Sequence, residues 1–143
     1  MTAAAAESPL WRAAVRPEAE QERMLVFSPL GPSLHALGLE TIYEGYLVHY
    51  GTPRVFAPAD PDTALVLGDY LYAHGLVRIA ETGDVAAVGA LAALISRCAQ
   101  LRAEGHDGDG EAWAATSMSL GDGAAPAGGD LDAALAAHRR LVG

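Results

Sequence analysis

The chain has 143 residues, of which 51% are apolar and only 6% aromatic, and its 9 basic residues, all arginines, stand against 18 acidic residues for a formal net charge of −9. An acidic surface without a polybasic patch repels phosphate groups, which excludes nucleic acid and anionic membrane surfaces as expected partners. The length suits one domain, and the abundance of alanine favours helices over strands. We therefore expect an acidic, all-α protein of the cytoplasm.

Two further features support this expectation. Cys98 is the single cysteine, so no disulfide can form within the chain, and its apolar helical surroundings predict a packing role. The most apolar stretch, Val85 to Ile95, is too short to cross a bilayer. We therefore expect no integral membrane span.

The N-terminal segment, residues 1–32, contains four prolines at a density that interrupts regular structure. One short helix is expected to begin at Pro17 and to run to Val26, with acidic residues in its first turn. The rest of the segment is expected to wrap around the domain or to be mobile.

Residues 33–105 form the predicted helical core, a small antiparallel bundle. Its apolar residues recur at steps of three and four, which predicts helices over residues 33–50, 60–83 and 84–104.

Capping residues set the ends of these helices. Ser33 is a suitable N-cap for the first helix, and Gly51 ends it. Asp60 is placed to cap the second helix, and Gly83 closes it. Because Asp84 follows directly and can cap the third helix, the second and third helices are expected to be antiparallel neighbours.

Small residues interrupt the second helix on one side. Gly68 and Gly75 lie a heptad apart, beside Tyr72, and a glycine inside a helix costs about 1 kcal/mol relative to alanine. The simplest interpretation is a seam where another helix approaches closely. Gly68, Tyr72 and Gly75 are therefore the predicted partner-packing residues, and a homo- or hetero-oligomer formed by helix packing is expected.

The composition changes in the last segment, residues 106–143. We expect, in order, a linker over 106–110, a short helix over 111–120, a Gly- and Ala-rich linker over 121–129 and a helix over 130–142 capped by Asp130. The last helix could dock on the core or stay loose. His106 and Asp107 lack the spacing of a calcium loop and read as a solvated linker.

Glu40 and Glu44 form the most informative pair for chemistry. They stand one turn apart, so their carboxylates lie on the same face of the first core helix. Two like charges at this spacing destabilise a helix mildly unless a cation bridges them. Arg54 or a divalent metal ion could supply that cation, and the alternative is a pair of solvated glutamates.

Several positions around this pair follow one order along the chain. They are Gly51 and Pro53 in the turn, Ala64, Leu67, Gly68, Asp69, Tyr70 and Leu71 in the next helix, and Gly83 and Asp84 at the corner. In this order residues 33–104 resemble the N-terminal half of the trans-polyprenyl diphosphate synthases, an all-helical family. There an Asp-rich metal motif is followed by a diphosphate-binding turn, a helix with a Gly-Asp pair and a similar corner.

The resemblance implies roles for four residues of this sequence. Glu40 and Glu44 fall at the outer positions of the motif that binds magnesium, and His49 and Arg54 fall near the bound diphosphate. Thr41, however, replaces the middle aspartate of that motif.

Other departures remove more of the family's machinery. His49 and Tyr50 replace its pair of diphosphate-binding arginines, and no second Asp-rich motif follows residue 105. The leading hypothesis is therefore a non-catalytic helical protein without a cofactor, acting as an accessory or partner subunit in prenyl diphosphate synthesis. The alternatives are a reduced prenyl transferase, completed by assembly and binding Mg²⁺ through Glu40 and Glu44, and an unrelated small helical interaction domain.

Overall fold

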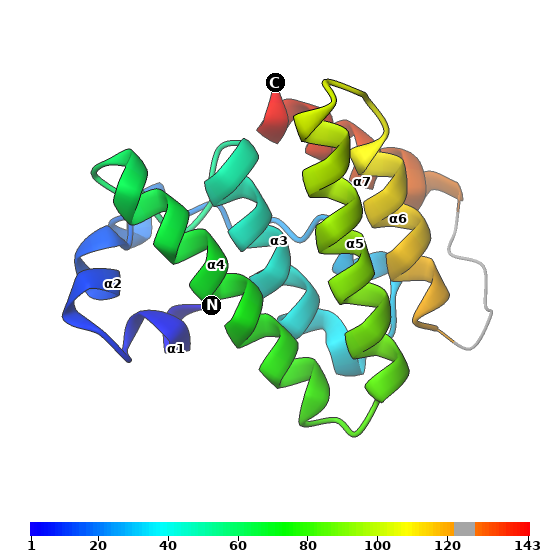
Figure 1. Cartoon of the computed structure of the whole chain (residues 1–143), viewed down its shortest axis with the longest axis horizontal. Coiled ribbons are helices and arrows are strands. Elements are labelled where there is room, and N and C mark those ends of the chain that lie inside the picture. The colour runs from blue at the N-terminus through cyan, green and yellow to red at the C-terminus, as the bar shows by residue number, and fades with distance from the viewer. Residues whose placement is uncertain (122–127) are drawn as a thin grey trace.

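The computed structural model describes residues 1–121 and 128–143, and within these ranges the chain is helical and contains no strand (Figure 1). The α-helices are α1 (Thr2–Ala5), α2 (Pro9–Ala14), α3 (Ala36–Tyr50), α4 (Pro61–Ala80), α5 (Val85–Ala103), α6 (Asp109–Ser119) and α7 (Gly128–Val142). Three short 3₁₀ helices precede α3, namely η1 (Glu18–Glu20), η2 (Ser28–Leu30) and η3 (Ser33–His35). The prediction of an all-α fold is confirmed.

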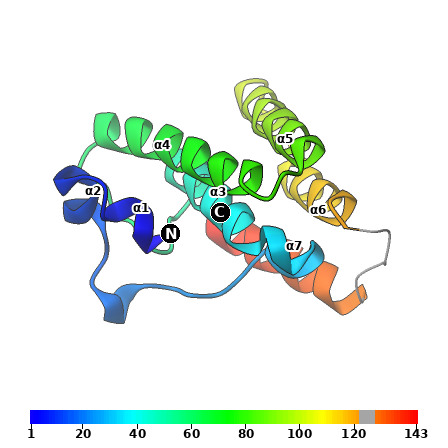
Figure 2. The ribbon, with the colours of Figure 1, turned by 90° about the horizontal axis from the view of Figure 1, so that it is seen from below.

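The central element is α3, which Figure 2 shows between α4 and α7. All residues from Gly38 to Val48 are buried. The sequence pattern marks one apolar face on this helix, but η2 and α7 also pack against it and bury other sides. Glu40 and Glu44 are thereby carried into the interior.

Glycines on both helices let α3 and α4 approach closely. A Cβ atom on Gly75 would lie 2.4 Å from Cγ1 of Ile42, and one on Gly45 would lie 2.8 Å from the backbone oxygen of Gly68. A Cβ atom on Gly68 would lie 2.4 Å from Nε2 of His49. The predicted seam therefore exists, but the helix that fills it is α3 of the same chain, so Gly68 and Gly75 require no second subunit.

The predicted corner between α4 and α5 is present. The Asp60 carboxylate accepts a hydrogen bond from the backbone N–H of Thr63 (2.8 Å), and that of Asp84 accepts one from Ala87 (2.9 Å). Between the two helices Gly83 has a φ of +82°, in the left-handed region that favours glycine. Local capping chemistry thus fixes both helix starts.

The start of α3 differs from the prediction. Ser33 begins η3 and makes no capping hydrogen bond, and α3 begins at Ala36. His35, directly before α3, is buried, and its Nε2 atom lies 3.0 Å from Oδ2 of Asp84. The Asp84 carboxylate therefore ties the start of α3 to the start of α5.

The N-terminal segment also differs. The helix expected over residues 17–26 is wrong, because only Glu18–Glu20 form a 3₁₀ turn and the rest has no helical structure. Instead α1 and α2 form and pack against α4, where the rings of Trp11 and Tyr70 lie 5.2 Å apart. Prolines stand at the starts of short helices here, such as Pro9 in the first turn of α2, and tertiary contacts decide which turns form.

Helix α5 has one buried side and one exposed side. α5 is the one described helix long and apolar enough to cross a membrane, with a mean hydropathy of 1.3 over its best window, of which 28% is buried. Length and composition are weak evidence for a span, since core helices pass the same test. On its inner side Leu91, Leu94 and Cys98 are buried, and burial raises the pKa of the Cys98 thiol to about 12.

The C-terminal helices complete the bundle. α6 begins at Asp109, two residues before the predicted start, and Asp130 lies in the first turn of α7 rather than at its cap. Most of the linker expected over 121–129 lies outside the described residues. α7 docks rather than staying loose, since Leu141 is buried and its carbonyl accepts a hydrogen bond from the Thr52 N–H (2.8 Å).

One hydrophobic core draws on all three expected segments of the chain. Phe27 comes from the first segment, Leu47 from the second and Trp113 from the third, and all three are buried. The rings of Phe27 and Trp113 stack with their centroids 5.7 Å apart. The N-terminal and C-terminal segments therefore pack into the same interior as the central helices.

Candidate functional site

The first candidate site is the cluster formed by Glu40, Glu44 and Arg54, which the sequence singled out. All three side chains are at most 3% exposed. The guanidinium of Arg54 donates from Nη1 to Oε2 of Glu40 (2.6 Å) and from Nε to Oε2 of Glu44 (3.1 Å). The sequence allowed either Arg54 or a divalent metal ion to bridge the two carboxylates. In the structure Arg54 bridges them.

Backbone groups saturate the rest of this cluster. Oε1 of Glu40 accepts from the N–H groups of Val26 and Ser28, each at 3.0 Å. Oε1 of Glu44 likewise accepts from Val55 (2.7 Å) and Phe56 (3.3 Å). Every carboxylate oxygen therefore has a donor, as buried charges require.

The charge on Arg54 is well supported inside the protein. Burial by itself disfavours the charged guanidinium, but the carboxylates of Glu40 and Glu44 outweigh it and raise the pKa of Arg54. Arg54 also donates to the backbone oxygens of Met24 (2.8 Å) and Glu40 (3.3 Å). The cluster thus fastens the N-terminal segment and the loop after α3 onto α3.

The hydrogen bonds of Glu40 and Glu44 decide whether this pair can bind magnesium. No carboxylate oxygen of Glu40 or Glu44 is free, so a cation could enter only if Arg54 left. Among the residues that the structure describes, no group of three or more His, Cys, Asp or Glu side chains is placed to hold a metal ion. The residues present therefore fit an internal ion pair and do not fit a metal centre.

His49, the other residue predicted to lie near a diphosphate, makes its contacts elsewhere. Its Nε2 atom lies 3.1 Å from Oδ1 of Asp69, and its ring lies over Gly68 and 5.2 Å from the ring of Tyr72. His49 and Tyr72 thus belong to the α3–α4 seam, whereas Arg54 belongs to the buried cluster.

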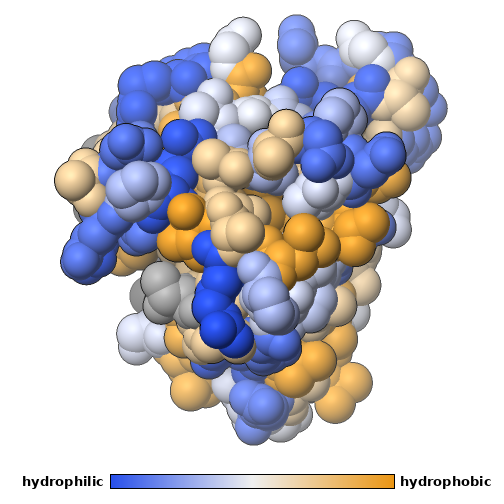
Figure 3. All heavy atoms as spheres, turned by 90° about the vertical axis from the view of Figure 1, so that its left-hand side faces the viewer, coloured by the Kyte–Doolittle hydropathy of each residue, from blue (hydrophilic) through white to orange (hydrophobic). Residues whose placement is uncertain are grey.

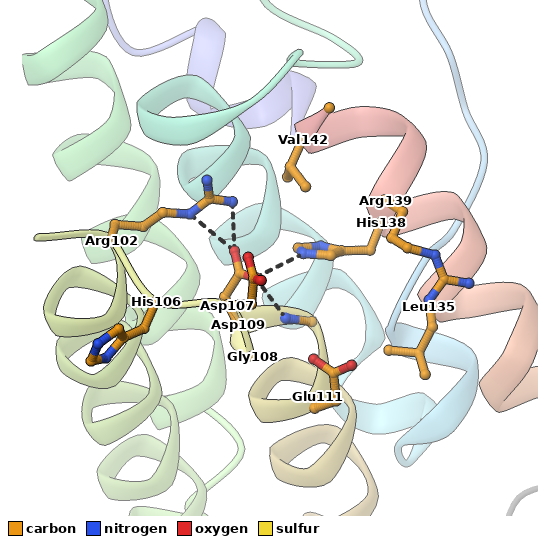
Figure 4. A pocket seen from close by; sticks show the side chains of 12 residues that line it. Arg102, His106, Asp107, Gly108, Asp109, Glu111, Leu135, His138, Arg139 and Val142 are labelled. Atoms are coloured by element: carbon orange, nitrogen blue, oxygen red, sulfur yellow. Dashed lines mark hydrogen bonds and ion pairs between the residues drawn. The ribbon is translucent and has the colours of Figure 1, made fainter. Parts of the chain in front are cut away.

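The second candidate site is a pocket of about 410 Å³ between the end of α5, the start of α6 and the end of α7 (Figure 4). Asp109, at the first position of α6, forms its floor. Figure 4 shows Arg102 and His138 reaching this carboxylate from opposite sides. Leu135 and Val142 of α7 add apolar lining.

The two oxygens of Asp109 differ in their partners. Oδ2 accepts hydrogen bonds from the Tyr46 hydroxyl and from Nε (3.1 Å) and Nη2 (2.6 Å) of Arg102. Oδ1 accepts one, from the N–H of Gly110 (3.0 Å). Burial alone would raise the pKa of Asp109, but the hydrogen bonds from Tyr46 and Arg102 hold it below its usual range. The floor of the pocket is therefore an ionised carboxylate with one lightly used oxygen.

His138 lies beside that oxygen and is only 3% exposed. Its Nδ1 atom is 2.9 Å from the Tyr43 hydroxyl, while Nε2 is 3.5 Å from Oδ1 of Asp109 and makes no hydrogen bond to any residue that the structure describes. Burial lowers the pKa of His138, although Asp109 acts in the opposite direction. His138 is thus a buried imidazole with one nitrogen unsatisfied at the pocket floor.

Gly110 makes this arrangement possible. A Cβ atom there would lie 2.8 Å from Cδ2 of His138, closer than packed atoms approach one another. Because Gly110 has no side chain, the His138 ring on α7 can reach Asp109.

Charged side chains that the floor does not use surround the mouth of the pocket. Asp107, Glu111 and Arg139 are exposed there, and none of them forms an ion pair within the described residues. His106 is also at the mouth and lies 3.3 Å from the Glu104 carboxylate.

A third hollow, of about 440 Å³, lies beside α4. There Glu7 accepts a hydrogen bond from the Tyr70 hydroxyl and lies 3.1 Å from Nε2 of His74. Figure 3 shows this side of the molecule, where apolar surface lies between hydrophilic patches, and the exposed apolar side chains of α2 and α4 include Leu10 and Leu65. The polar contacts in this hollow join the N-terminal segment to α4.

The sequence alone brings Glu40, Glu44 and Arg54 together as candidates but misses the pocket at Asp109. Its members come from α3, α5, α6 and α7, and no local spacing relates them. One signal was present: His138 falls on the apolar side of the last helix, where a polar ring needs a partner.

The comparisons with known proteins add no family to these observations. No protein-family model, no curated protein and no solved structure matches this chain.

Proposed function

We propose that this chain is a non-catalytic partner subunit of a prenyl diphosphate synthase. The resemblance in the sequence supplies the class of partner. The observation that carries the non-catalytic part is the buried cluster of Glu40, Arg54 and Glu44, in which an arginine of the chain already neutralises the acidic pair.

The chemistry of the synthases explains why this matters. Ionising an allylic diphosphate places negative charge on the leaving group, and preorganised cations must stabilise it. Carboxylates that are saturated by Arg54 and by backbone N–H groups cannot hold magnesium for that purpose. The same residues instead strengthen a scaffold, which is what a partner subunit needs.

The outward side of α5 is the surface proposed for the partner. Its exposed residues include Ala86, Gly89, Ala93 and Ser96, and a Cβ atom on Gly89 would meet nothing within 4 Å. Small side chains allow a helix to approach closely, as glycines do between α3 and α4. We infer that a helix of the catalytic subunit packs along this side.

The test combines mass and activity. Native mass spectrometry of the chain mixed with a catalytic trans-polyprenyl synthase subunit should show a complex, and the product length or rate of that subunit should change. Ala93→Arg should abolish both effects, whereas Ala115→Arg, an exposed alanine on α6, should leave them intact.

Two outcomes would contradict the proposal. One is the absence of any complex with synthase subunits from the native host. The other is formation of prenyl diphosphates by the chain alone with magnesium, which would support the reduced-transferase alternative.

A further inference from the structure

The hollow beside α4 is lined by a row of hydrogen-bond donors on one side of that helix. Tyr70, His74 and Arg78 follow one another at steps of four residues, which places their side chains along the same side of the helix. The first two are engaged by the N-terminal segment: the Tyr70 hydroxyl donates to Oε2 of Glu7, and Nε2 of His74 lies 3.1 Å from Oε1. Arg78 is the member of the row that this segment leaves unused.

The guanidinium of Arg78 is open to a ligand. It forms no ion pair and no hydrogen bond with any residue that the structure describes. Its Nε atom is buried, but its two terminal Nη atoms are not, so the end of the side chain is accessible from the hollow. The two Nη atoms form a planar fork that matches the geometry of a carboxylate.

A carboxylate stands near this guanidinium without pairing with it. Glu81 directly follows α4, three residues after Arg78, and it is exposed and also lines the hollow. Side chains three residues apart on a helix are neighbours, yet within the described ranges no ion pair joins Glu81 to Arg78 or to another residue. Both oxygens of Glu7 already have partners. The hollow therefore holds one positive and one negative group that are available together.

Two opposite charges at one site select a ligand that carries both signs. A simple carboxylate would pair with Arg78 but meet repulsion from Glu81, and a simple amine would meet the reverse. A zwitterion pairs with both residues, and its zero net charge makes it indifferent to the net charge of −9 on the chain. Val77, which is 56% exposed, and Ala73 add apolar lining for an aliphatic side chain.

We propose that the hollow beside α4 binds a free aliphatic amino acid, whose carboxylate pairs with Arg78 and whose ammonium group pairs with Glu81. The volume of about 440 Å³ is that of a small-molecule site. The inference is independent of the partner-subunit proposal, because the hollow lies on α4 and not on the outward side of α5.

The probe is leucine, added to the full chain at neutral pH. It is compared with isocaproate, which has the same carbon skeleton without the ammonium group, and with isoamylamine, which lacks only the carboxylate. A titration followed by the methyl NMR signals of Val77 should saturate for leucine with a dissociation constant on the order of 1 mM. Isocaproate and isoamylamine should each bind about 3- to 10-fold more weakly, because each forms only one of the two ion pairs.

Two variants assign the two ends of the ligand. Arg78→Gln and Glu81→Gln should each weaken leucine binding about 3- to 10-fold. Arg78→Gln should also remove the preference for leucine over isoamylamine, and Glu81→Gln should remove the preference over isocaproate, because each variant deletes the partner of the group that the analogue lacks. The matched control is Arg97→Gln, at an exposed position of α5 that does not line the hollow, and it should leave all three affinities unchanged.

The selectivity pattern decides the proposal. Leucine that fails to saturate, or that binds no better than both analogues, would overturn it. Preferences that survive Arg78→Gln and Glu81→Gln, or that are lost equally in Arg97→Gln, would overturn it as well. If Arg78→Gln fails to fold, the comparison of leucine with isocaproate in Glu81→Gln still gives the answer, since Glu81 is exposed.

Discussion

The two polar clusters of this protein are built from similar groups but are completed to different degrees. In the cluster of Glu40, Arg54 and Glu44 every carboxylate oxygen has a donor from the chain itself. In the cluster at Asp109 and His138, Nε2 of His138 is buried 3.5 Å from Oδ1 of Asp109 and makes no hydrogen bond within the described residues. The first cluster is therefore closed by hydrogen bonds throughout, whereas the second is closed more loosely.

Their positions in the chain explain the difference. Arg54 follows α3 by four residues, so one helix and its own loop supply both ion pairs of the first cluster, and the N-terminal segment adds the N–H groups of Val26 and Ser28. The second cluster joins α3, α5, α6 and α7, whose distances depend on how whole helices pack. Local geometry can therefore form the ion pairs of the first, and only the assembled bundle sets the second.

The largest expected effect is on the saturated cluster. Arg54→Met would leave two buried carboxylates without a cation, and removing one partner of a buried ion pair costs about 3–5 kcal/mol. Urea denaturation should show this loss in the free energy of unfolding. Adding Glu40→Gln and Glu44→Gln to the same variant removes both unpaired charges but keeps the acceptors for the backbone N–H groups.

This triple variant should therefore regain at least about 1 kcal/mol relative to Arg54→Met alone, because the three residues act as a unit. If Arg54→Met unfolds no more easily than the wild-type protein, the guanidinium is not what neutralises the pair.

A smaller loss is expected where the pocket is packed most tightly. Gly110→Ala would place a methyl group against the His138 ring and should cost about 1–3 kcal/mol through overpacking. The matched control is Gly89→Ala, inside α5, where the added methyl meets nothing and should stabilise the protein by about 0.5–1 kcal/mol. Thermal denaturation of both variants measures the contrast, and equal shifts would show that His138 does not depend on Gly110.

The stability contributed by the cluster at Asp109 and His138 should also depend on pH. Burial lowers the pKa of His138 below its ordinary value of 6.5, against the opposing effect of Asp109. In the window below pH 6.5 the unfolded chain binds this proton more readily than the folded one, so stability falls as the pH falls. The slope from this one group is at most about 1.4 kcal/mol per pH unit.

The control for this window is His138→Gln, compared with the wild-type protein between pH 7 and the range where carboxylates begin to titrate, below about pH 5. The charged groups that influence the pKa of His138 are Asp109, Arg102 and Glu111, and the Tyr43 hydroxyl lies 2.9 Å from its Nδ1. A wild-type slope equal to that of the variant would mean that His138 is not the titrating group.

The smallest effect is expected at the surface. Arg140 donates to Glu22 (2.6 Å) and joins α7 to the N-terminal segment, but both side chains are substantially exposed. Ion pairs of this kind are screened by solvent and salt and contribute little. Arg140→Gln should leave the midpoint of urea denaturation unchanged within error. A large decrease in that midpoint would show that this ion pair, rather than the buried apolar side of α7, holds the helix in place.

The sequence by itself determined the helical class and the helix ends that local chemistry controls. Asp60 and Asp84 cap α4 and α5, and Gly83 makes the corner between them, because capping needs only residues a few positions apart. It also identified Glu40 and Glu44 as a pair that needs a cation and named Arg54 as one candidate, since all three lie within one helix and the following loop.

Tertiary structure alone decided which surfaces those elements share. Gly68 and Gly75 indicate a close helix contact, but the residue pattern does not determine whether the approaching helix belongs to the same chain. In the structure that helix is α3 of the same chain. The expected helix over residues 17–26 gave way to an irregular segment that bonds to α3 through the Val26 N–H and Glu40, and the meeting of Asp109 with His138 depends on several helices docking together. Contacts between residues far apart in the chain follow from the fit of whole surfaces, which no local spacing encodes.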